Sequence, residues 1–168
     1  MIEPMKRAVE IVRMFNGLER EQLYFLLKKA FPKRNPNLDV DRLLRMKLLF
    51  QENSLIRIPY SEINPDMCEA VRILQLFWSK NIVHYCGGNK PVLLKITKLM
   101  GKSAVDFYIC KDSDISRVNA YDDNSIVIIL TDNMQLACPH LCNYVLAVKD
   151  DNDRYNFYKN NKNKEEFN

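Results

Sequence analysis

Hydrophobic residues in the first third of the chain recur at helical spacing. In the first segment they lie one, three or four positions apart, which is typical of an amphipathic helix, at Met5, Ala8, Val9, Val12 and Phe15. Asn16 and Gly17 are expected to end this helix. A second helix is predicted over Leu18–Phe31. The prolines and asparagines of residues 32–37 then break the chain, because they do not continue a helix.

A third helix is expected to begin near Asp39, a favourable N-cap residue, and to continue to about Glu52. Its apolar face would hold Val40, Leu43, Met46 and Phe50. The opposite face would hold Arg42, Arg45 and Leu49. Alternating residues at 55–58 predict a short strand. Helix, helix, turn, helix and strand is the order of a winged helix-turn-helix, and we interpret residues 1–60 as this module.

Residues 61–80 predict a helix that links this module to the rest of the chain. Asn64 suits an N-cap, and Pro65 suits the first helical position. The apolar stripe that follows is formed by Met67, Val71, Leu74, Phe77 and Trp78. We expect this linking helix to pack between the module before it and the domain after it.

The period changes from helical to alternating over residues 81–159. The predicted strands are IVHYC, PVLLKITK, AVDFYIC, SIVIIL, LCNYVLAV and RYNFYK. A short helix is expected over KDSDISRVNAY, and a helix or loop over TDNMQLACPH. SIVIIL is apolar throughout, which fits a strand buried on both faces. The predicted fold class is therefore α+β, with a small mixed α/β domain at 81–159 and a polar, disordered tail at 160–168.

Composition and charge restrict the classes of protein to which this chain can belong. The chain has 168 residues, of which 47% are hydrophobic, as expected for one or two small folded domains. No apolar run approaches the ~20 residues of a membrane helix, and the first residues do not resemble a signal peptide. Five cysteines at irregular spacing indicate reduced thiols rather than a disulfide framework. We therefore expect a cytoplasmic protein without a membrane partner.

Positive charge gathers in the predicted winged helix. Residues 1–60 hold 12 Lys and Arg against 7 Asp and Glu, a net charge of +5, whereas residues 61–168 hold 13 against 14, a net charge of −1. Arg42 and Arg45 are candidate DNA contacts, because arginine bridges phosphates and reaches guanine edges. Lys33, Arg34 and Arg57 would flank them on neighbouring loops. The alternative is an ordinary solvated helix face.

The order of segments resembles proteins of mobile elements, found on plasmids, conjugative elements and phages, that are related to the replication-relaxation family. The resemblance covers about residues 5–159, and its best local matches are NPDMCEAVRILQLFW, IVHYCGGNKPVLLKIT, DFYIC, NSIVIILTDN and NYVLAVKDDNDRYNFYK. It implies an N-terminal winged helix followed by an α/β domain that resembles a reduced nuclease-type core. It also implies a role in plasmid replication or DNA relaxation.

Catalytic chemistry is not evident in the second domain. A nuclease core of that type needs an acid on one strand and an acid-x-lysine pair on the next, which together hold a divalent metal. Asp106 is a lone acid in its strand, without such a pair on the adjacent strand. Cys138, His140 and Cys142 offer three zinc ligands at a spacing that zinc sites rarely use. We therefore expect no enzyme activity, no metal and no cofactor.

Two functional classes follow from these patterns. The first is a DNA-binding accessory or regulatory protein whose winged helix contacts double-stranded DNA and whose α/β domain docks a protein partner or a second copy in a homodimer. The second is a protein-interaction adaptor that uses the winged helix as a docking surface. A divergent nuclease with scattered acids is a third, weaker alternative.

Overall fold

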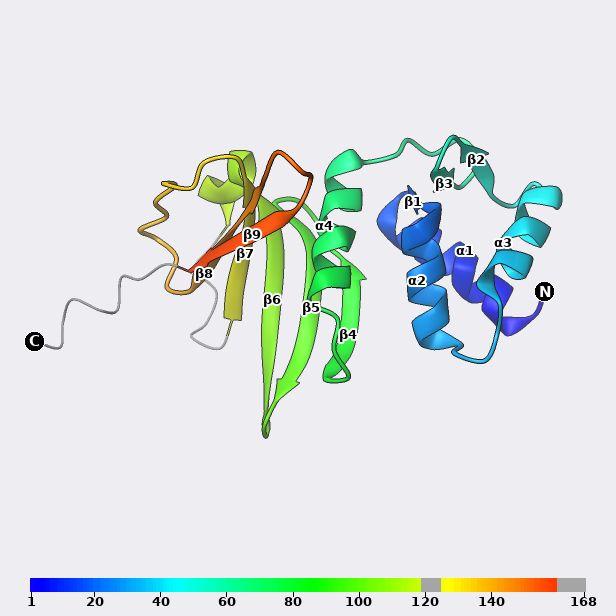
Figure 1. Cartoon of the computed structure of the whole chain (residues 1–168), viewed down its shortest axis with the longest axis horizontal. Coiled ribbons are helices and arrows are strands. Elements are labelled where there is room, and N and C mark those ends of the chain that lie inside the picture. Colours follow the sequence, from blue (N-terminus) through cyan, green and yellow to red (C-terminus); the bar gives the residue numbers. More distant parts are fainter. Residues whose placement is uncertain (119–124, 160–168) are drawn as a thin grey trace, which may run out of the picture. The chain divides into compact units, whose positions relative to one another are not determined.

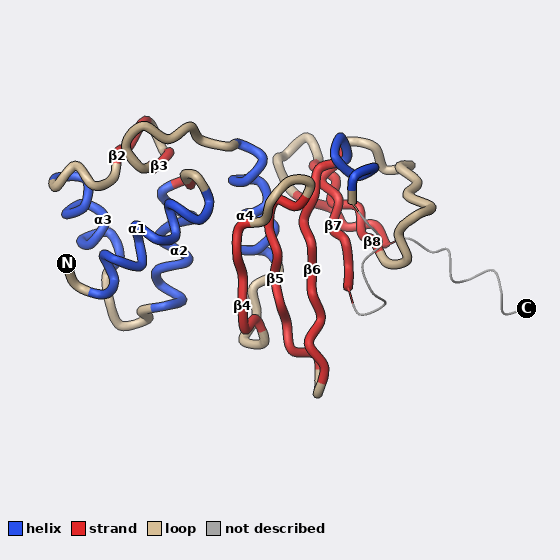
Figure 2. Tube along the Cα trace, turned by 180° about the vertical axis from the view of Figure 1, so that it is seen from behind, coloured by secondary structure: helices blue, strands red, loops and turns tan. Residues whose placement is uncertain are grey.

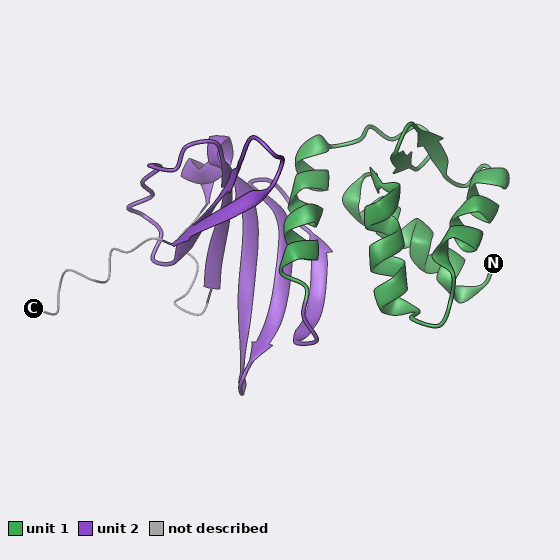
Figure 3. Ribbon diagram, in the orientation of Figure 1, with its two compact units in different colours: residues 1–78 green, residues 79–168 purple. Residues whose placement is uncertain are grey.

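The computed structural model describes residues 1–118 and 125–159. The protein is of the α+β class, with a helical first part and a six-stranded mixed sheet in the second (Figure 1). The chain divides into two compact units, Met1–Trp78 and a second that begins at Ser79 (Figure 3). No helix in the described ranges is long and apolar enough to cross a membrane. The tail at 160–168, which we expected to be disordered, lies outside the described residues.

The first unit consists of four helices and a small antiparallel sheet. Its elements are α1 (Glu3–Phe15), β1 (Leu18–Glu19), α2 (Arg20–Ala30), α3 (Pro36–Arg45), β2 (Phe50–Glu52), β3 (Leu55–Arg57) and α4 (Pro65–Leu76). The sheet has the order β1-β3-β2. The first predicted helix is confirmed as α1, which ends at Asn16 in the left-handed conformation and buries the face that contains Met5, Ala8, Val12 and Phe15.

The predicted start of the second helix is wrong. Leu18 and Glu19 form β1, in which they lie opposite Ile56 and Leu55 of β3. Glu19 then serves as the N-cap of α2 in a capping box, because its backbone N–H donates to Oε1 of Gln22 at 3.1 Å. The helix therefore begins two residues later than its local sequence suggests, since pairing with a strand more than 30 residues away removes Leu18 and Glu19 from it.

The predicted bounds of the third helix are also wrong. Helix α3 begins at Pro36, and its N-cap is Asn35, whose side chain accepts a hydrogen bond from the backbone N–H of Asn37 at 3.2 Å. Pro36 belongs to the helix because a proline in the first turn leaves no hydrogen bond unmade. Asp39, our expected cap, is buried within α3. The helix ends at Arg45, well before Glu52.

The early end of α3 changes which residues are buried after it. Lys47 adopts a positive φ of 56° and turns the chain. The residues after it are not helical, so the helical period no longer decides which of them are buried. Leu49, expected on the exposed face, is 1% exposed. Met46 and Phe50, expected on the buried face, are 51% and 42% exposed. Val40 and Leu43 lie within the helix and are buried as predicted.

Helix α4 groups with the first unit rather than forming a separate linking segment over 61–80. The predicted N-cap is confirmed, because the side chain of Asn64 accepts from the backbone N–H of Asp66 at 3.0 Å. The side-chain amide of Gln22 donates to the backbone oxygen of Cys68 at 2.7 Å in a buried contact. Nη2 of Arg72 lies 2.8 Å from Oε1 of Glu19. These contacts join α4 to β1 and α2.

The second unit contains a single mixed sheet of six strands (Figure 2). Its elements are β4 (Ile82–Gly87), β5 (Val92–Met100), β6 (Ser103–Lys111), the 3₁₀ helix η1 (Asp112–Arg117), β7 (Ser125–Thr131), β8 (Tyr144–Lys149) and β9 (Tyr155–Lys159). The strands follow one another in sequence order, and the pairs β6–β7 and β7–β8 are parallel whereas the others are antiparallel. The prediction of a mixed sheet is confirmed.

Strand β7 is buried on both faces, as its apolar run predicted. Val127 and Ile129 belong to a core cluster on one face, and Ile128 on the other face is fully buried. The cluster also holds Val92, Cys110, Val118, Cys138, Leu141, Tyr144, Leu146 and Val148. Residues 132–143 form a loop that contributes Cys138 and Leu141 to this core. The predicted strand LCNYVLAV begins only at Tyr144.

Candidate nucleic-acid interface

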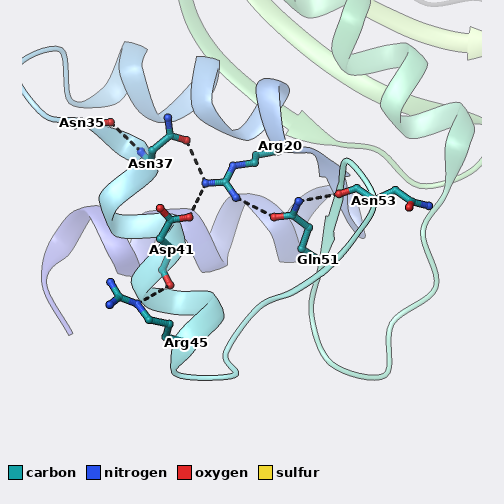
Figure 4. A network of polar contacts seen from close by, with 7 residues as sticks. All are labelled: Arg20, Asn35, Asn37, Asp41, Arg45, Gln51 and Asn53. Atoms are coloured by element: carbon teal, nitrogen blue, oxygen red, sulfur yellow. Dashed lines mark hydrogen bonds and ion pairs between the residues drawn. The ribbon is translucent and has the colours of Figure 1, made fainter.

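The last turns of α3 present two arginines to solvent. Arg42 and Arg45 are both exposed. Nε of Arg45 donates to the backbone oxygen of Asp41 at 3.4 Å (Figure 4). Within residues 1–118 and 125–159, the side chain of Arg42 has no hydrogen bond or ion pair. Because an arginine has five N–H donors, both side chains keep donors available for a phosphate or a base edge.

The two acidic residues of α3 are paired with arginines from outside the helix. Oδ1 of Asp39 lies 3.3 Å from Nη2 of Arg34, and Oδ1 of Asp41 lies 2.6 Å from Nη2 of Arg20. Each pair offsets a carboxylate that would otherwise repel a polyanion. The exposed charge that α3 itself contributes is therefore the positive charge of Arg42 and Arg45.

Arg20, on α2, connects α2 to α3 and to β2. Its guanidinium donates to the side chains of Asp41 and Asn37 on α3, at 2.6 and 3.4 Å, and to Oε1 of Gln51 on β2 at 2.9 Å (Figure 4). Nε2 of Gln51 in turn donates to the backbone oxygen of Asn53 at 2.7 Å. This network holds the β2–β3 hairpin against α2 and α3.

Sequence reasoning did not find Arg20. Its partners Asp41 and Gln51 lie 21 and 31 positions further along the chain, so no local spacing points to the contact. The backbone N–H of Arg20 also donates to the backbone oxygen of Ser54, in the turn between β2 and β3, at 2.7 Å. Arg20 is thus a positioning residue that fixes the hairpin next to α3.

The three flanking cations that we predicted differ in their surroundings. Lys33 is exposed in the loop between α2 and α3. Arg34 is held by its ion pair with Asp39. Arg57 is half-buried, and its Nη1 donates to the backbone oxygen of Ser61 at 3.2 Å. Lys33 is therefore more available to a ligand than Arg34 or Arg57, both of which have structural partners.

Apolar side chains are also exposed near the arginines. Leu38 on α3 is 67% exposed. Met46 and Leu48 follow the helix, and Phe50 lies on β2; all three are exposed. Exposed apolar groups that gather in one region are a feature of protein-interaction surfaces. This part of the first unit thus combines positive charge with apolar area.

In the second unit, Asp106 forms a polar cluster with residues of β5 and β6. Nζ of Lys95 lies 2.8 Å from Oδ2 of Asp106, and the hydroxyl of Thr97 donates to Oδ1 at 2.7 Å. The Tyr108 hydroxyl donates to Oδ2 at 3.4 Å. The strand register explains the contacts, because Thr97 lies opposite Asp106 and Lys95 lies opposite Tyr108. Both carboxylate oxygens are therefore already hydrogen-bonded.

The pKa of the Asp106 carboxyl lies below its ordinary value. Burial acts to raise this pKa, but the hydrogen bonds from Lys95 and Thr97 favour the charged form and outweigh it. The pKa of the Lys95 ammonium is raised, chiefly by its hydrogen bond to Asp106. The two groups thus stabilise each other's charged forms in the folded state.

We expect replacement of Asp106 by Asn to make the stability of the fold less dependent on pH in the acidic range. A depressed carboxyl pKa contributes stability that is present above the unfolded-state value of 3.8 and is lost as the pH falls through the folded-state value. Asp106→Asn should therefore be less stable than wild type at neutral pH, and the difference should shrink below about pH 4. Urea unfolding followed by circular dichroism between neutral pH and pH 2 measures this.

The control is Asp151→Asn, in the exposed turn before β9, which removes the same charge outside the cluster. If the stability difference between wild type and Asp106→Asn stayed constant down to pH 2, the ion pair with Lys95 would not be a source of folded-state stability.

The three residues considered as zinc ligands have different environments. Cys138 is buried in the core cluster, whereas Cys142 is exposed in the loop before β8. Nε2 of His140 lies 3.1 Å from the backbone oxygen of Ile115. In the described part of the chain, no three His, Cys, Asp or Glu side chains are placed to hold a metal ion together.

Comparison of the chain with protein-family models, with curated proteins and with solved structures found no match.

Proposed function

We propose that the first unit is a winged helix-turn-helix that binds double-stranded DNA, and that the protein is a non-catalytic accessory or regulatory protein. The order α1-β1-α2-α3-β2-β3 and the sheet order β1-β3-β2 support this proposal, because a winged helix places a hairpin beside its recognition helix. The observation that carries the proposal is the exposure of Arg42 and Arg45 on a helix whose acids are paired with other arginines.

In this proposal α3 enters the major groove of the duplex. Arg42 and Arg45 bridge phosphates or reach guanine edges from the helix, and Lys33 approaches the backbone from the loop before α3. Arg20 keeps the hairpin in a fixed position relative to α3 through Asp41 and Gln51. The second unit would dock a protein partner or a second copy. A role in a mobile element, in plasmid replication or DNA relaxation, is proposed on the resemblance alone.

We expect the wild-type protein to bind a random duplex with an affinity that falls steeply with salt. Contacts from Lys33, Arg42 and Arg45 to three phosphates would give a slope of about −2.7 in a plot of log affinity against log salt concentration. The affinity should then fall by roughly 40-fold between about 50 and 200 mM salt. Fluorescence anisotropy of a labelled duplex measures it. Absence of binding at the lower salt concentration would contradict the proposal that the first unit binds DNA.

A second candidate function is supported by the apolar side chains near α3. Leu38, Met46, Leu48 and Phe50 are exposed, and a module that docks on a protein would bury them. This candidate predicts an interaction that changes little with salt, because apolar burial is not screened by ions. Replacing Leu38 with Ser should then weaken self-association, measured by light scattering.

A further inference from the structure

A groove in the first unit lies apart from the exposed arginines of α3. It has a volume of about 690 Å³, which falls within the range of about 300–1,000 Å³ that is typical of small-molecule sites. Residues of α2, the first turn of α3 and α4 line it, namely Arg20, Glu21, Tyr24, Phe25, Lys28, Lys29, Asn37 and Gln75. Its size and its mixed apolar and charged lining are those of a site for a small ligand.

Two aromatic rings contribute to the α2 wall of the groove. Tyr24 and Phe25 are both half-buried. The Phe25 ring packs edge-to-face against Trp78, with ring centroids 5.4 Å apart and an interplanar angle of 89°. Nζ of Lys29 lies 5.0 Å from the Phe25 centroid and 5.9 Å from the Trp78 centroid. Phe25 therefore contacts both Trp78 and Lys29, whereas the Tyr24 ring makes no contact of this kind with the described residues.

Positive charge lies one helical turn away from each ring. Residues four apart on a helix are neighbours on its surface, so Tyr24 is next to Lys28 and Phe25 is next to Lys29. Nζ of Lys28 donates to the backbone oxygen of Arg34 at 3.1 Å, and an ammonium has three donors, so two remain. Glu21 is the single acid of the lining. The lysine end of the groove thus favours an anion beside an aromatic surface.

Neutral hydrogen-bonding groups complete the lining. The side chains of Asn37 and Gln75 both carry a donor and an acceptor, which suits the edge of a heterocyclic base. Arg20 also lines the groove, but its guanidinium is engaged by Asp41, Gln51 and Oδ1 of Asn37, so the amide NH₂ of Asn37 is the part that remains for a base edge. A ring to stack on, amides for a base edge and ammonium groups for a phosphate are the three kinds of contact that a nucleotide needs.

We propose that this groove binds a nucleotide unit, with its base against Tyr24 and its phosphate at Lys28 and Lys29. The nucleotide is either a free mononucleotide or one unit of a single strand, because both offer the same ring and phosphate. The lining shares no residue with the proposed duplex contacts Lys33, Arg42 and Arg45. An acidic peptide would pair with Lys28 and Lys29, but it has no heterocyclic base to contact the side-chain amides of Asn37 and Gln75.

Titration of the full chain with three probes tests the proposal. The probes are ATP, a short oligothymidine and inorganic phosphate, and the signal is the emission of Trp78, the single tryptophan of the chain, whose ring contacts Phe25. We expect ATP or oligothymidine to bind at least about tenfold more tightly than phosphate. Tyr24→Ala should weaken that binding at least about fivefold, the lower end of the loss for one stacking ring, while Tyr24→Phe should retain it.

Lys28→Gln combined with Lys29→Gln should reduce both the affinity and its salt dependence. Circular dichroism checks that each variant is folded. Tyr24→Ala should keep the affinity of wild type for duplex DNA, and the double variant Arg42→Ala/Arg45→Ala should keep the affinity of wild type for ATP. The nucleotide site and the duplex-binding surface are thus tested independently of each other.

Three results would overturn the proposal. These are the absence of binding of both nucleotide probes to wild type, an affinity for phosphate equal to that for the tighter-binding nucleotide probe, and an unchanged affinity of Tyr24→Ala for that nucleotide probe. An acidic peptide is a fourth probe, and its binding in place of either nucleotide probe would be a fourth result that contradicts the proposal, because it would assign the groove to a protein partner. Preference for oligothymidine over ATP would identify the single strand as the source of the nucleotide.

Discussion

Replacing Arg42 and Arg45 together with alanine is expected to lower the affinity for a random duplex at least about tenfold, which corresponds to about 1.4 kcal/mol of binding free energy. Both side chains are exposed on the last turns of α3, so the loss comes from contacts with DNA rather than from the core. The slope of log affinity against log salt should become less steep by about 2, because each phosphate contact contributes close to one unit. Anisotropy titrations at several salt concentrations measure both quantities.

The control variant removes the same charge from another helix of the same unit. Lys6 and Arg13 are exposed on α1. Their joint replacement by alanine should change the affinity for duplex DNA less than about threefold, because it alters only the long-range electrostatic field of the unit. Both double variants should unfold at nearly the wild-type temperature, since exposed charges contribute little to stability. Equal losses of affinity in the two double variants would mean that α3 is not the contact helix.

Replacing Gly17 with alanine is expected to destabilise the first unit by roughly 2–4 kcal/mol, because backbone strain and overpacking each cost about 1–3 kcal/mol. Gly17 follows α1 and has a φ of 108°, a conformation that L side chains rarely adopt. A Cβ atom there would lie 2.9 Å from Cγ1 of Ile63 and 3.2 Å from the backbone oxygen of Ile56. The added methyl group therefore meets both backbone strain and a close contact with β3.

The neighbouring residue provides the control for this turn. Asn16 also has a positive φ, of 57°, and is exposed. Asn16→Gly should change stability by less than about 1 kcal/mol, because asparagine tolerates the left-handed region. Urea unfolding followed by Trp78 emission reports on the first unit, to which Trp78 belongs. A loss below 1 kcal/mol for Gly17→Ala would show that Ile63 and β3 move aside readily.

The elements that were predicted correctly carry their signals within a few residues. Helix α1 is marked by apolar spacing and by Asn16 and Gly17 at its end. Helix α4 is marked by Asn64 and Pro65 at its start. Strand β7 is a continuous apolar run. In each case the cap or the period acts locally, so it can be found without knowledge of the rest of the chain.

The elements that were predicted wrongly depend on distant partners or on a competing local signal. Leu18 and Glu19 have helical neighbours, but they pair with Ile56 and Leu55 of β3. The stretch after Arg45 keeps a helical pattern in the sequence, yet the turn at Lys47 and the pairing of β2 with β3 end the helix. The sequence around Pro36 predicts a break in the chain, but proline is also favourable at the first position of a helix, where the structure places it.

The sequence by itself determined the α+β class, the mixed sheet and the exposure of Arg42 and Arg45, because apolar period, caps and charge are properties of short segments. Only the tertiary structure decided that Arg20 offsets Asp41 and holds the hairpin, that Arg34 offsets Asp39, and that Tyr24 shares a groove with Gln75. These contacts join residues on different elements. Their energies depend on distances that no local spacing specifies, and so they become visible only once the chain is folded.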